Sequence, residues 1–359
     1  MVNIRIAKVR SEVMKKKTIF ALLILLLFTC SAFAQPASPS SDIQALLGFY
    51  QSEGDNVIIR EREGRLEFLY GVTVDDWPFN QSNVFQMRKK RYDEYELVTA
   101  NPRDYRMILN VKFERDGKGK GITLVIDKQR YSRIFFAGEN ANDFKLTPSQ
   151  PVDALRRNAE ASIMPNQPGN LLAAKLVDIS RKDSQIKINM VYATDKNFID
   201  TAIYESNKAY LQEDAANALS RVNKELAKYG YGVVVWDAYR PWYISKLLHD
   251  VLPEKDKGLL ESPETGSQHN RGLSVDVSLY YLATGQQVQM ISGFDEPSLR
   301  AYSKFQGGSE LERFRRDLLR QLMENEGFTT IDHEWWHFDY KDFTNYQLLN
   351  IPFNELDKE

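Results

Sequence analysis

Residues 267–279 read SQHNRGLSVDVSL and place a histidine, His269, seven residues ahead of an aspartate, Asp276. Seven extended residues would span about 23 Å at about 3.3 Å each, so the chain must turn if both side chains are to bind one ion. Gly272 can adopt the positive φ that such a turn needs. By itself, this pattern is compatible with half of a metal site, or with a turn histidine followed by an aspartate at the edge of a sheet.

The segment after Gly272 alternates between apolar and polar residues, which is typical of a β-strand with two different faces. The apolar face would carry Leu273, Val275 and Val277, and the polar face would carry Ser274, Asp276 and Ser278. We therefore expect Asp276 to project away from the apolar side, where a carboxylate ligand would be needed.

A second histidine motif lies near the C-terminus, where residues 331–338 read IDHEWWHF, so the two motifs hold three of the four histidines of the chain. His269, Asp276 and His337 would give a tetrahedral zinc ion three protein ligands and leave its fourth position open to water, as in a catalytic site. Glu334 would then act as the general base. Because residues three apart share a helix face but not a strand face, an extended EWWH segment needs a twist or a bulge to aim both groups at the site.

The other two histidines are expected to have different roles. We interpret His333 as a bystander or supporting group, and His249, within YISKLLHD, as an ordinary helix residue. Arg240 lies in WDAYRP, where Pro241 requires the chain to leave a buried strand. A guanidinium at such a strand end can point into a cleft and stabilise developing negative charge, or it can form a surface salt bridge, and the motif alone favours neither.

Two longer segments have the periodicity of amphipathic helices. Residues 214–230, DAANALSRVNKELAKYG, carry apolar residues at helical spacing, with Asp214 placed to cap the start and Gly230 just past the end. Residues 309–327, SELERFRRDLLRQLMENEG, repeat this arrangement before Gly327. Since strands are predicted between them, the second half is expected to be an α+β domain.

The first half contains short runs of residues that are typical of β-strands. RLEFLY, YRMILNVKFE and GITLVID are β-branched or aromatic runs separated by the turn sequences DGKGKG and GENAND. We predict a mostly antiparallel, β-rich accessory domain over 42–148, in which KKRYDEYE is a solvated face. A linker rich in Pro, Asn, Gln and Ser, with room for one short helix, follows over 149–170, and the second domain over 171–359.

Residues 1–34 have the layout of a secretory signal peptide, with KKK, an apolar run and then AFA. The run is too short to span a membrane in the mature protein. We expect export to the periplasm or the extracellular space, without a lipid anchor at Cys30, because the preceding Phe28 and Thr29 suit lipid modification poorly. The mature chain would have no cysteine, so any metal must bind to His, Asp and Glu.

The charge of the mature chain argues against a nucleic-acid partner. Removal of the signal segment, with its six basic residues and one acidic residue, changes the formal net charge from −2 to −7. Such a chain repels a phosphate backbone.

Five motifs, in this order, resemble those of the zinc-dependent D-alanyl-D-alanine dipeptidases, the family that includes the vancomycin-resistance dipeptidases. The motifs are YATDKNF, GYGVVVWDAYRP, SQHNRGLSVDVSL, SGFDE and EWWHF. The D,D-carboxypeptidases, which share the histidine signatures, are similar more distantly. The resemblance covers about residues 176–353 and does not extend to the β-rich domain.

The resemblance implies a role for each matching residue. It implies one zinc ion per chain bound by His269, Asp276 and His337, with Glu334 as base, Arg240 as stabiliser of the intermediate, Asp295 as partner of the substrate ammonium, and Ser267 and Tyr192 as pocket residues. The chain departs from shorter family members in its N-terminal domain and in GLSVD, where a smaller pair often precedes the aspartate.

The function expected from these features is an exported zinc metallopeptidase that hydrolyses D-alanyl-D-alanine in cell-wall metabolism. A D,D-carboxypeptidase acting on longer muropeptides is the alternative, and it would lack the acid in SGFDE, because its substrate has no free amine there. A non-catalytic wall-binding protein is a further alternative. The only partner expected is the small D,D-dipeptide substrate, and the sequence does not predict an oligomeric state.

Overall fold

The computed structural model describes residues 35–71, 84–99, 109–136, 139, 144–148, 150–167, 169, 171–341 and 343–358. The expected signal segment 1–34, with Cys30, lies outside them. Residues Ser38–Glu359 form one compact unit. In the described part of the chain, no helix combines the length and the apolar character needed to cross a membrane.

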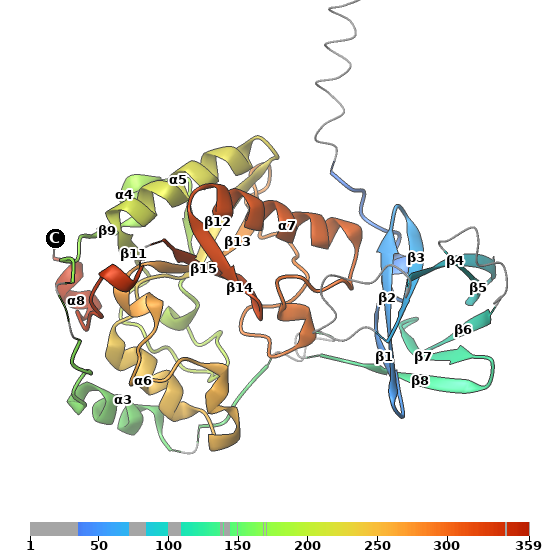
Figure 1. Cartoon of the computed structure of the whole chain (residues 1–359), viewed down its shortest axis with the longest axis horizontal. Coiled ribbons are helices and arrows are strands. Elements are labelled where there is room, and N and C mark those ends of the chain that lie inside the picture. The colour runs from blue at the N-terminus through green and yellow to red at the C-terminus, as the bar shows by residue number, and fades with distance from the viewer. Residues whose placement is uncertain are drawn as a thin grey trace, which may run out of the picture. The chain divides into compact units, whose positions relative to one another are not determined.

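The first half is a closed antiparallel barrel that follows a short helix, α2 (Ser41–Gln44) (Figure 1). β1 pairs with β2 on one side and with β8 on the other, which closes the sheet. The β2–β3 turn has positive φ at Glu63 and Gly64, as the tightest hairpins require. The barrel strands are β1 (Gly48–Ser52), β2 (Asp55–Arg62), β3 (Arg65–Tyr70), β4 (Val84–Arg91), β5 (Glu94–Thr99), β6 (Leu109–Arg115), β7 (Gly121–Ile126) and β8 (Gln129–Ile134).

The second half is built on a five-stranded sheet. Its strands, in spatial order, are β10 (Lys187–Ile188), β12 (Tyr231–Asp237), β13 (Ser274–Tyr281), β15 (Glu334–Tyr340) and β14 (Phe328–Ile331). Among these described strands, the β10–β12 pairing is the only parallel one, and the other three pairings are antiparallel. A smaller sheet pairs β9 (Leu176–Asp178) with β11 (Tyr210–Gln212). The predicted α+β class, with a preceding antiparallel β domain, is therefore confirmed.

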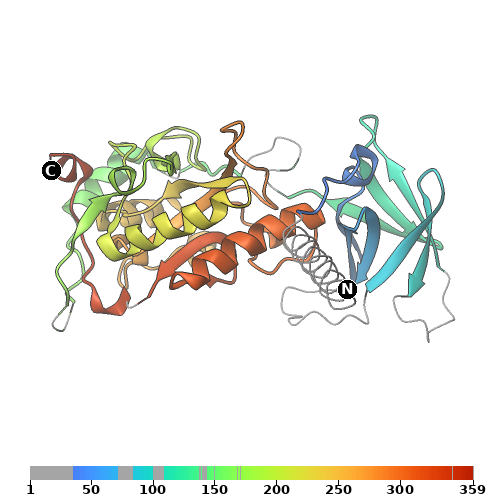
Figure 2. The same cartoon turned by 90° about the horizontal axis from the view of Figure 1, so that it is seen from above.

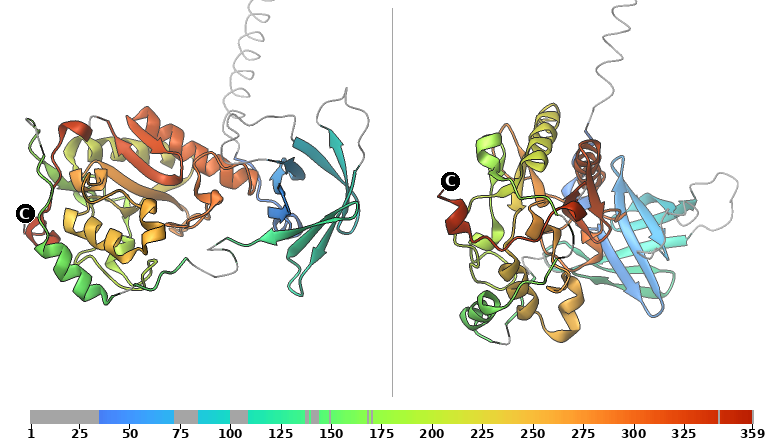
Figure 3. Two further views of the ribbon diagram at one scale, coloured as in Figure 1. Left: turned by 60° about the horizontal axis from the view of Figure 1, so that its bottom comes forward. Right: turned by 60° about the vertical axis from the view of Figure 1, so that its left-hand side comes forward.

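Helices cover both sides of the five-stranded sheet. On one side, α5 (Glu213–Ala227) packs on β12 and α7 (Glu310–Asn325) on β14, and the two helices lie side by side (Figure 2). On the other side lie α6 (Trp242–Val251) and α3 (Val152–Ala161), which pack together (Figure 3). The short helices α4 (Ile179–Lys182) and α8 (Phe353–Leu356) complete the set described.

The two predicted amphipathic helices are present, with one correction. Helix α7 begins after Ser309, whose side chain forms a capping box with Glu312. Helix α5 begins after Gln212, which makes no side-chain capping bond, so the prediction that Asp214 caps this helix is wrong. Asp214 instead lies in the first turn, where a negative charge interacts favourably with the helix dipole.

The segment expected as a linker carries helix α3. Leu155 and Ala159 of this helix are buried in the same hydrophobic cluster as strands β12 and β13. This part of the segment is therefore packed into the second half.

The barrel and the second half share hydrogen bonds at the β2–β3 hairpin. The Arg313 guanidinium donates to the Glu61 carbonyl at 2.7 Å, and the Glu310 amide donates to the Glu61 carboxylate at 2.8 Å. Glu61 therefore accepts from the first turn of α7, where backbone amides lack partners within the helix.

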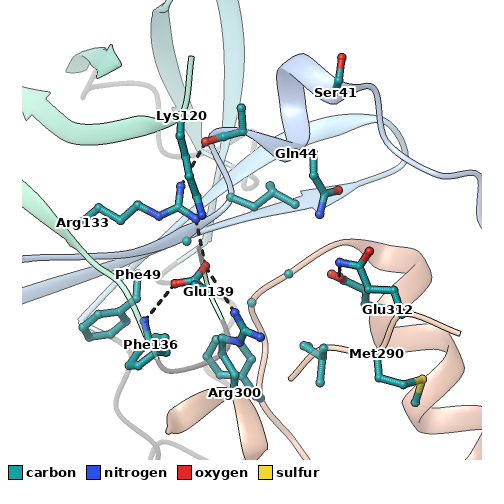
Figure 4. A pocket seen from close by; sticks show the side chains of 18 of the residues that line it. Ser41, Gln44, Phe49, Lys120, Arg133, Phe136, Glu139, Met290, Arg300 and Glu312 are labelled. Atoms are coloured by element: carbon teal, nitrogen blue, oxygen red, sulfur yellow. Dashed lines mark hydrogen bonds and ion pairs between the residues drawn. The ribbon is translucent and has the colours of Figure 1, made fainter. Parts of the chain in front are cut away.

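A charged cavity of about 470 Å³ is lined by residues from both halves. In Figure 4, Arg133 and Arg300 both reach toward Glu139, at 3.2 Å and 3.4 Å respectively. Arg133 also donates to the Ala45 and Gly121 carbonyls. These contacts tie the end of the barrel to the loop that holds Arg300.

Candidate active site

The three predicted metal ligands converge in the second half. His269 lies in a short 3-10 turn, η5 (Gln268–Arg271), Asp276 in β13 and His337 in β15. One ligand atom from each residue lies within 4.8 Å of the others. His337 Nδ1 is 3.0 Å from Asp276 Oδ1, and His269 Nε2 is 3.4 Å from Asp276 Oδ2. The turn between His269 and Asp276 is made as expected, with Gly272 at φ +66°.

The face of β13 that carries Asp276 is polar but not exposed. Ser274 and Ser278 are fully buried, and Asp276 is 3% exposed. The alternation predicted from the sequence therefore separates a polar interior face from an apolar one.

Two further acceptors orient the histidine rings. His269 Nδ1 is 2.7 Å from the Ala238 carbonyl, and His337 Nε2 is 3.0 Å from Asp339 Oδ1. Asp339 also accepts a hydrogen bond from the Ser274 hydroxyl. If these ring nitrogens carry the protons, the opposite nitrogens face Asp276 with lone pairs, as metal ligands must.

The electrostatics of the cluster suit a bound cation. Burial lowers the pKa of His337, but Asp276 and Asp339 outweigh it and raise that pKa well above its usual value. Burial raises the pKa of Asp276, but His269 and His337 hold it well below its usual range. The buried cluster thus favours positive charge, and a metal ion supplies that charge while accepting all three donor atoms.

Glu334 lies beside this cluster, as predicted for a base. Its Oε2 is 3.8 Å from His337 Nδ1, and burial raises its pKa to about 7. The register of β14 against β15 shifts here, because Thr330 pairs with Phe338 but Ile331 pairs with Glu334. The residues between Glu334 and Phe338 therefore leave the regular ladder with β14, although His337 stays paired with Asp276 of β13. Such a distortion is what two groups three residues apart on one strand require.

Arg240 is buried rather than part of a surface salt bridge. Its Nε and Nη2 donate to Asp237 Oδ2 at 2.9 and 2.6 Å, and Tyr204 donates to Asp237 Oδ1 at 2.7 Å. Burial opposes the charge of Arg240, but Asp237 outweighs it and raises the pKa of the guanidinium well above its usual value. Arg240 is therefore a fixed cation at the end of β12.

A bulge in β12 places Asp237 opposite Asp276. Val235 pairs with Val277, whereas the next paired residue, Asp237, lies across from Asp276, so Trp236 is an extra residue. Such bulges change where a strand aims its side chains and are common beside active sites.

Asp295 accepts a hydrogen bond of 2.8 Å from the Tyr192 hydroxyl. Its φ is +55°, a left-handed conformation that aspartate tolerates better than most residues. Burial raises the pKa of Asp295 well above its usual range, although the Tyr192 hydrogen bond acts in the opposite sense. Asp295 is thus held in a site where a cationic partner would stabilise its ionised form.

The remaining sequence candidates have local roles. Ser267 is buried and caps the η5 turn, with its Oγ accepting from the His269 amide at 3.3 Å. Tyr192 is also buried, with its hydroxyl on Asp295. His333 is exposed on a cavity wall, and His249 is part of α6, 3.8 Å from Asp250.

Asp237, Tyr204 and Asp339 are site residues to which the sequence interpretation assigned no role. Asp237 and Asp339 lie within three residues of Arg240 and His337, so closeness to a motif residue was the signal available. That signal is weak, because it cannot show which neighbours point inward.

Asp295 and Glu334 both line a cavity of about 590 Å³. Trp336 and Phe198 contribute to its apolar walls. The two carboxylates therefore face one space in which a small molecule could bind.

Comparison with known proteins agrees with this arrangement. The family model of the D-ala-D-ala dipeptidases, peptidase M15, matches residues 172–358. The D-alanyl-D-alanine dipeptidase of Escherichia coli is 31% identical over 180 residues, which cover 50% of this chain and 92% of the relative. The dipeptidase of Enterococcus faecalis is 32% identical, over 45% of this chain and 85% of the relative.

The solved structure of the LdcB LD-carboxypeptidase aligns with 55% of this chain and 87% of its own, at 18% identity and a TM-score of 0.30. That likeness is too weak for any inference. The family match over residues 172–358 and the buried His269, Asp276 and His337 cluster agree. The chain belongs to the D-ala-D-ala dipeptidase family of metallopeptidases.

Proposed function

We propose that this protein is an exported zinc dipeptidase that hydrolyses D-alanyl-D-alanine, or a closely related D,D-dipeptide, in cell-wall metabolism. The supporting observation is that Asp295 and Glu334 line one cavity beside the His269, Asp276 and His337 cluster. An acid able to pair with a free ammonium and a base able to act at the next carbonyl therefore share one space. A dipeptide presents both groups this close together.

Zinc is the metal that the donor set favours. Two imidazole nitrogens and one carboxylate are accepted by zinc, and three protein ligands leave a position open. When bound, the ion would polarise the scissile carbonyl and acidify a water molecule.

The protein groups around the metal would divide the remaining work. Glu334 would take a proton from the attacking water and pass it to the leaving amine. Arg240, held by Asp237, would stabilise negative charge that develops on the carbonyl oxygen. Asp295 would bind the substrate ammonium and so set the position of the scissile bond.

A D,D-carboxypeptidase acting on longer muropeptides is the second candidate. Its substrate is acylated at the position of the free amine, which would leave Asp295 without a cationic partner in a buried site. A non-catalytic wall-binding protein would have no need for the orienting contacts of His269 and His337. Both considerations favour the dipeptidase.

Export is a separate part of the proposal. It rests on the basic, apolar and small-residue pattern of residues 1–34. Fractionation of the native host, with detection of the protein outside the cytoplasm, supports this part, and retention in the cytoplasm contradicts it.

Release of D-amino acid by the purified protein tests the activity. D-Ala-D-Ala, D-Ala-D-lactate and a muramyl pentapeptide are compared at equal concentration. The proposal expects turnover of the dipeptide and little release from the pentapeptide. Preference for the pentapeptide would favour the carboxypeptidase, and no release from any substrate in metal-loaded protein would favour the binding protein.

A further inference from the structure

The cavity that holds Asp295 and Glu334 is far larger than an alanine methyl group requires. Its volume is about 590 Å³, within the range of sites that bind drug-sized ligands. Most of the other lining residues are apolar or aromatic, and the polar ones among them are Glu296, Ser298 and His333. The apolar and aromatic residues include Phe144, Phe198, Leu252, Leu260, Tyr302 and Trp336.

One wall of the cavity comes from outside the family region. Phe144 precedes residues 172–358, which the family model matches, and lines the cavity beside Phe198, with 5.9 Å between the ring centroids. Its position is fixed by the two residues that follow. The Leu146 amide donates to the Phe198 carbonyl at 2.7 Å, and Lys145 Nζ donates to the Asn197 carbonyl at 2.8 Å. Phe144 is therefore an anchored part of the wall.

The charged groups of the cavity indicate which end of a substrate enters it. Asp295, Glu296 and Glu334 line the cavity, and none of the described lining residues is Lys or Arg. Glu296 is already paired, because it accepts from the Gly293 amide at 3.0 Å and from Arg300 at 3.1 Å. This charge pattern suits the amino end of a peptide and repels its carboxylate.

We propose that this cavity is a specificity subsite for a large apolar side chain on the N-terminal residue of the dipeptide. The inference rests on the proposed dipeptidase function, which puts the ammonium at Asp295 and the scissile carbonyl beside Glu334. The Cα atom between those two groups belongs to the N-terminal residue. The side chain of the N-terminal residue is therefore attached inside the cavity. It would extend toward the walls that include Phe144 and Phe198.

The preferred substrate class is then a D,D-dipeptide with a leucine-sized or phenylalanine-sized first residue. One methylene group more or less in an apolar site can change kcat/KM between two substrates by roughly 10- to 200-fold. We expect kcat/KM for D-Leu-D-Ala and D-Phe-D-Ala to exceed that for D-Ala-D-Ala by about tenfold or more. All three dipeptides are assayed on the purified, metal-loaded full chain.

The outcomes separate this inference from the function on which it rests. Faster hydrolysis of D-Ala-D-Ala than of both bulky dipeptides overturns the subsite and leaves the dipeptidase function intact. Absence of hydrolysis for all three dipeptides overturns the function itself.

Gly258 allows a variant that adds a side chain at the edge of the cavity with little strain. Gly258 lines the cavity, a Cβ atom added there meets no heavy atom within 4 Å, and its φ is not in the left-handed region. Gly117, in a barrel turn away from this cavity, has the same open surroundings and the same ordinary backbone. Gly258→Phe and Gly117→Phe therefore form a matched pair.

The measurement is the ratio of kcat/KM for D-Leu-D-Ala to that for D-Ala-D-Ala. We expect Gly258→Phe to lower this ratio by about tenfold, because the added ring occupies the space of the larger side chain. Gly117→Phe should keep the parent ratio. An unchanged ratio in Gly258→Phe protein that folds and binds metal as the parent does would overturn the proposal.

Discussion

The Tyr192 hydroxyl and the Asp295 carboxylate are joined by a hydrogen bond of 2.8 Å, although the two residues lie 103 positions apart in the chain. Tyr192 is fully enclosed among Phe198, Tyr204 and Phe294, whose rings pack against it edge-on. A rigid tyrosine thus holds the acid that we assign to the substrate ammonium.

Asp295→Asn should reduce the hydrolysis of substrates with a free amine selectively. The change removes one charge of a buried pair, which costs on the order of 2 to 5 kcal/mol in kcat/KM. N-acetyl-D-Ala-D-Ala has no ammonium, so its slow hydrolysis should hardly change. Arg240→Ala serves as the comparison, since loss of the cation should slow both substrates. Equal losses of kcat/KM on both substrates in Asp295→Asn would show that Asp295 is an ordinary turn residue and does not bind the substrate ammonium.

The metal content of the protein should depend on His269 and His337. We expect one zinc ion per parent chain and almost none in the His269→Ala/His337→Ala double variant, because a single carboxylate cannot retain the ion against dialysis. Elemental analysis of dialysed protein gives the stoichiometry. His249→Ala, on helix α6, is the matched histidine control and should keep the full content. Full retention by the double variant would contradict the ligand assignment.

Glu334→Gln should separate metal binding from catalysis. The amide can hold a water molecule but cannot accept its proton, a role that contributes roughly 100- to 10,000-fold to the rate. The variant should therefore contain as much zinc as the parent and show a kcat lower by about that factor. Near-normal turnover in the zinc-loaded variant would mean that another residue is the base.

Asp339→Asn should weaken metal binding without removing a ligand. Asp339 orients the His337 ring through a contact of 3.0 Å, and loss of such partners lowers metal affinity by about 10- to 100-fold. Competition with a chromophoric chelator measures this affinity. Asp332→Asn is the control, because Asp332 is exposed and its carboxylate contacts Lys304. Equal affinity of the Asp339→Asn protein and the control would show that Asp339 does not support the ligand.

Asp237 and Arg240 should be coupled in stability. Removal of one partner from a buried pair leaves an uncompensated charge, at a cost of about 3 to 5 kcal/mol. Asp237→Asn should therefore lower the free energy of unfolding more than Asp237→Asn combined with Arg240→Gln lowers it. Urea denaturation of Asp237→Asn, Arg240→Gln, the combined variant and the parent gives the four unfolding free energies of this double-mutant cycle. Additive losses would show that the pair is not energetically linked.

The central features of the site could be predicted because they depend on local rules. Gly272 is required wherever the chain turns between His269 and Asp276, and the alternation after it orients the strand. The same local rules identified the periodicity of α5 and α7. Their ends were less predictable, since Gln212 precedes α5 although Asp214 has the stronger capping side chain.

The remaining contacts depend on pairings that a single segment does not encode. Asp237 faces Asp276 because a bulge at Trp236 shifts the register of two strands. The barrel closes because β1 meets β8, about eighty residues away along the chain. Neither the bulge nor the closure leaves a distinct pattern in the residues that make it.

The anchoring of Phe144 and of helix α3 bears on how relatives of this protein are compared. A polypeptide trimmed to the shared region, starting at residue 172, would lack Leu155 and Ala159 and would expose the surface of α6 that α3 covers. It would also lose the aromatic wall that Leu146 and Lys145 fasten to the loop at Asn197 and Phe198. Selectivity measured on such trimmed enzymes would make divergent family members look alike, because the trimming removes a segment in which they can diverge.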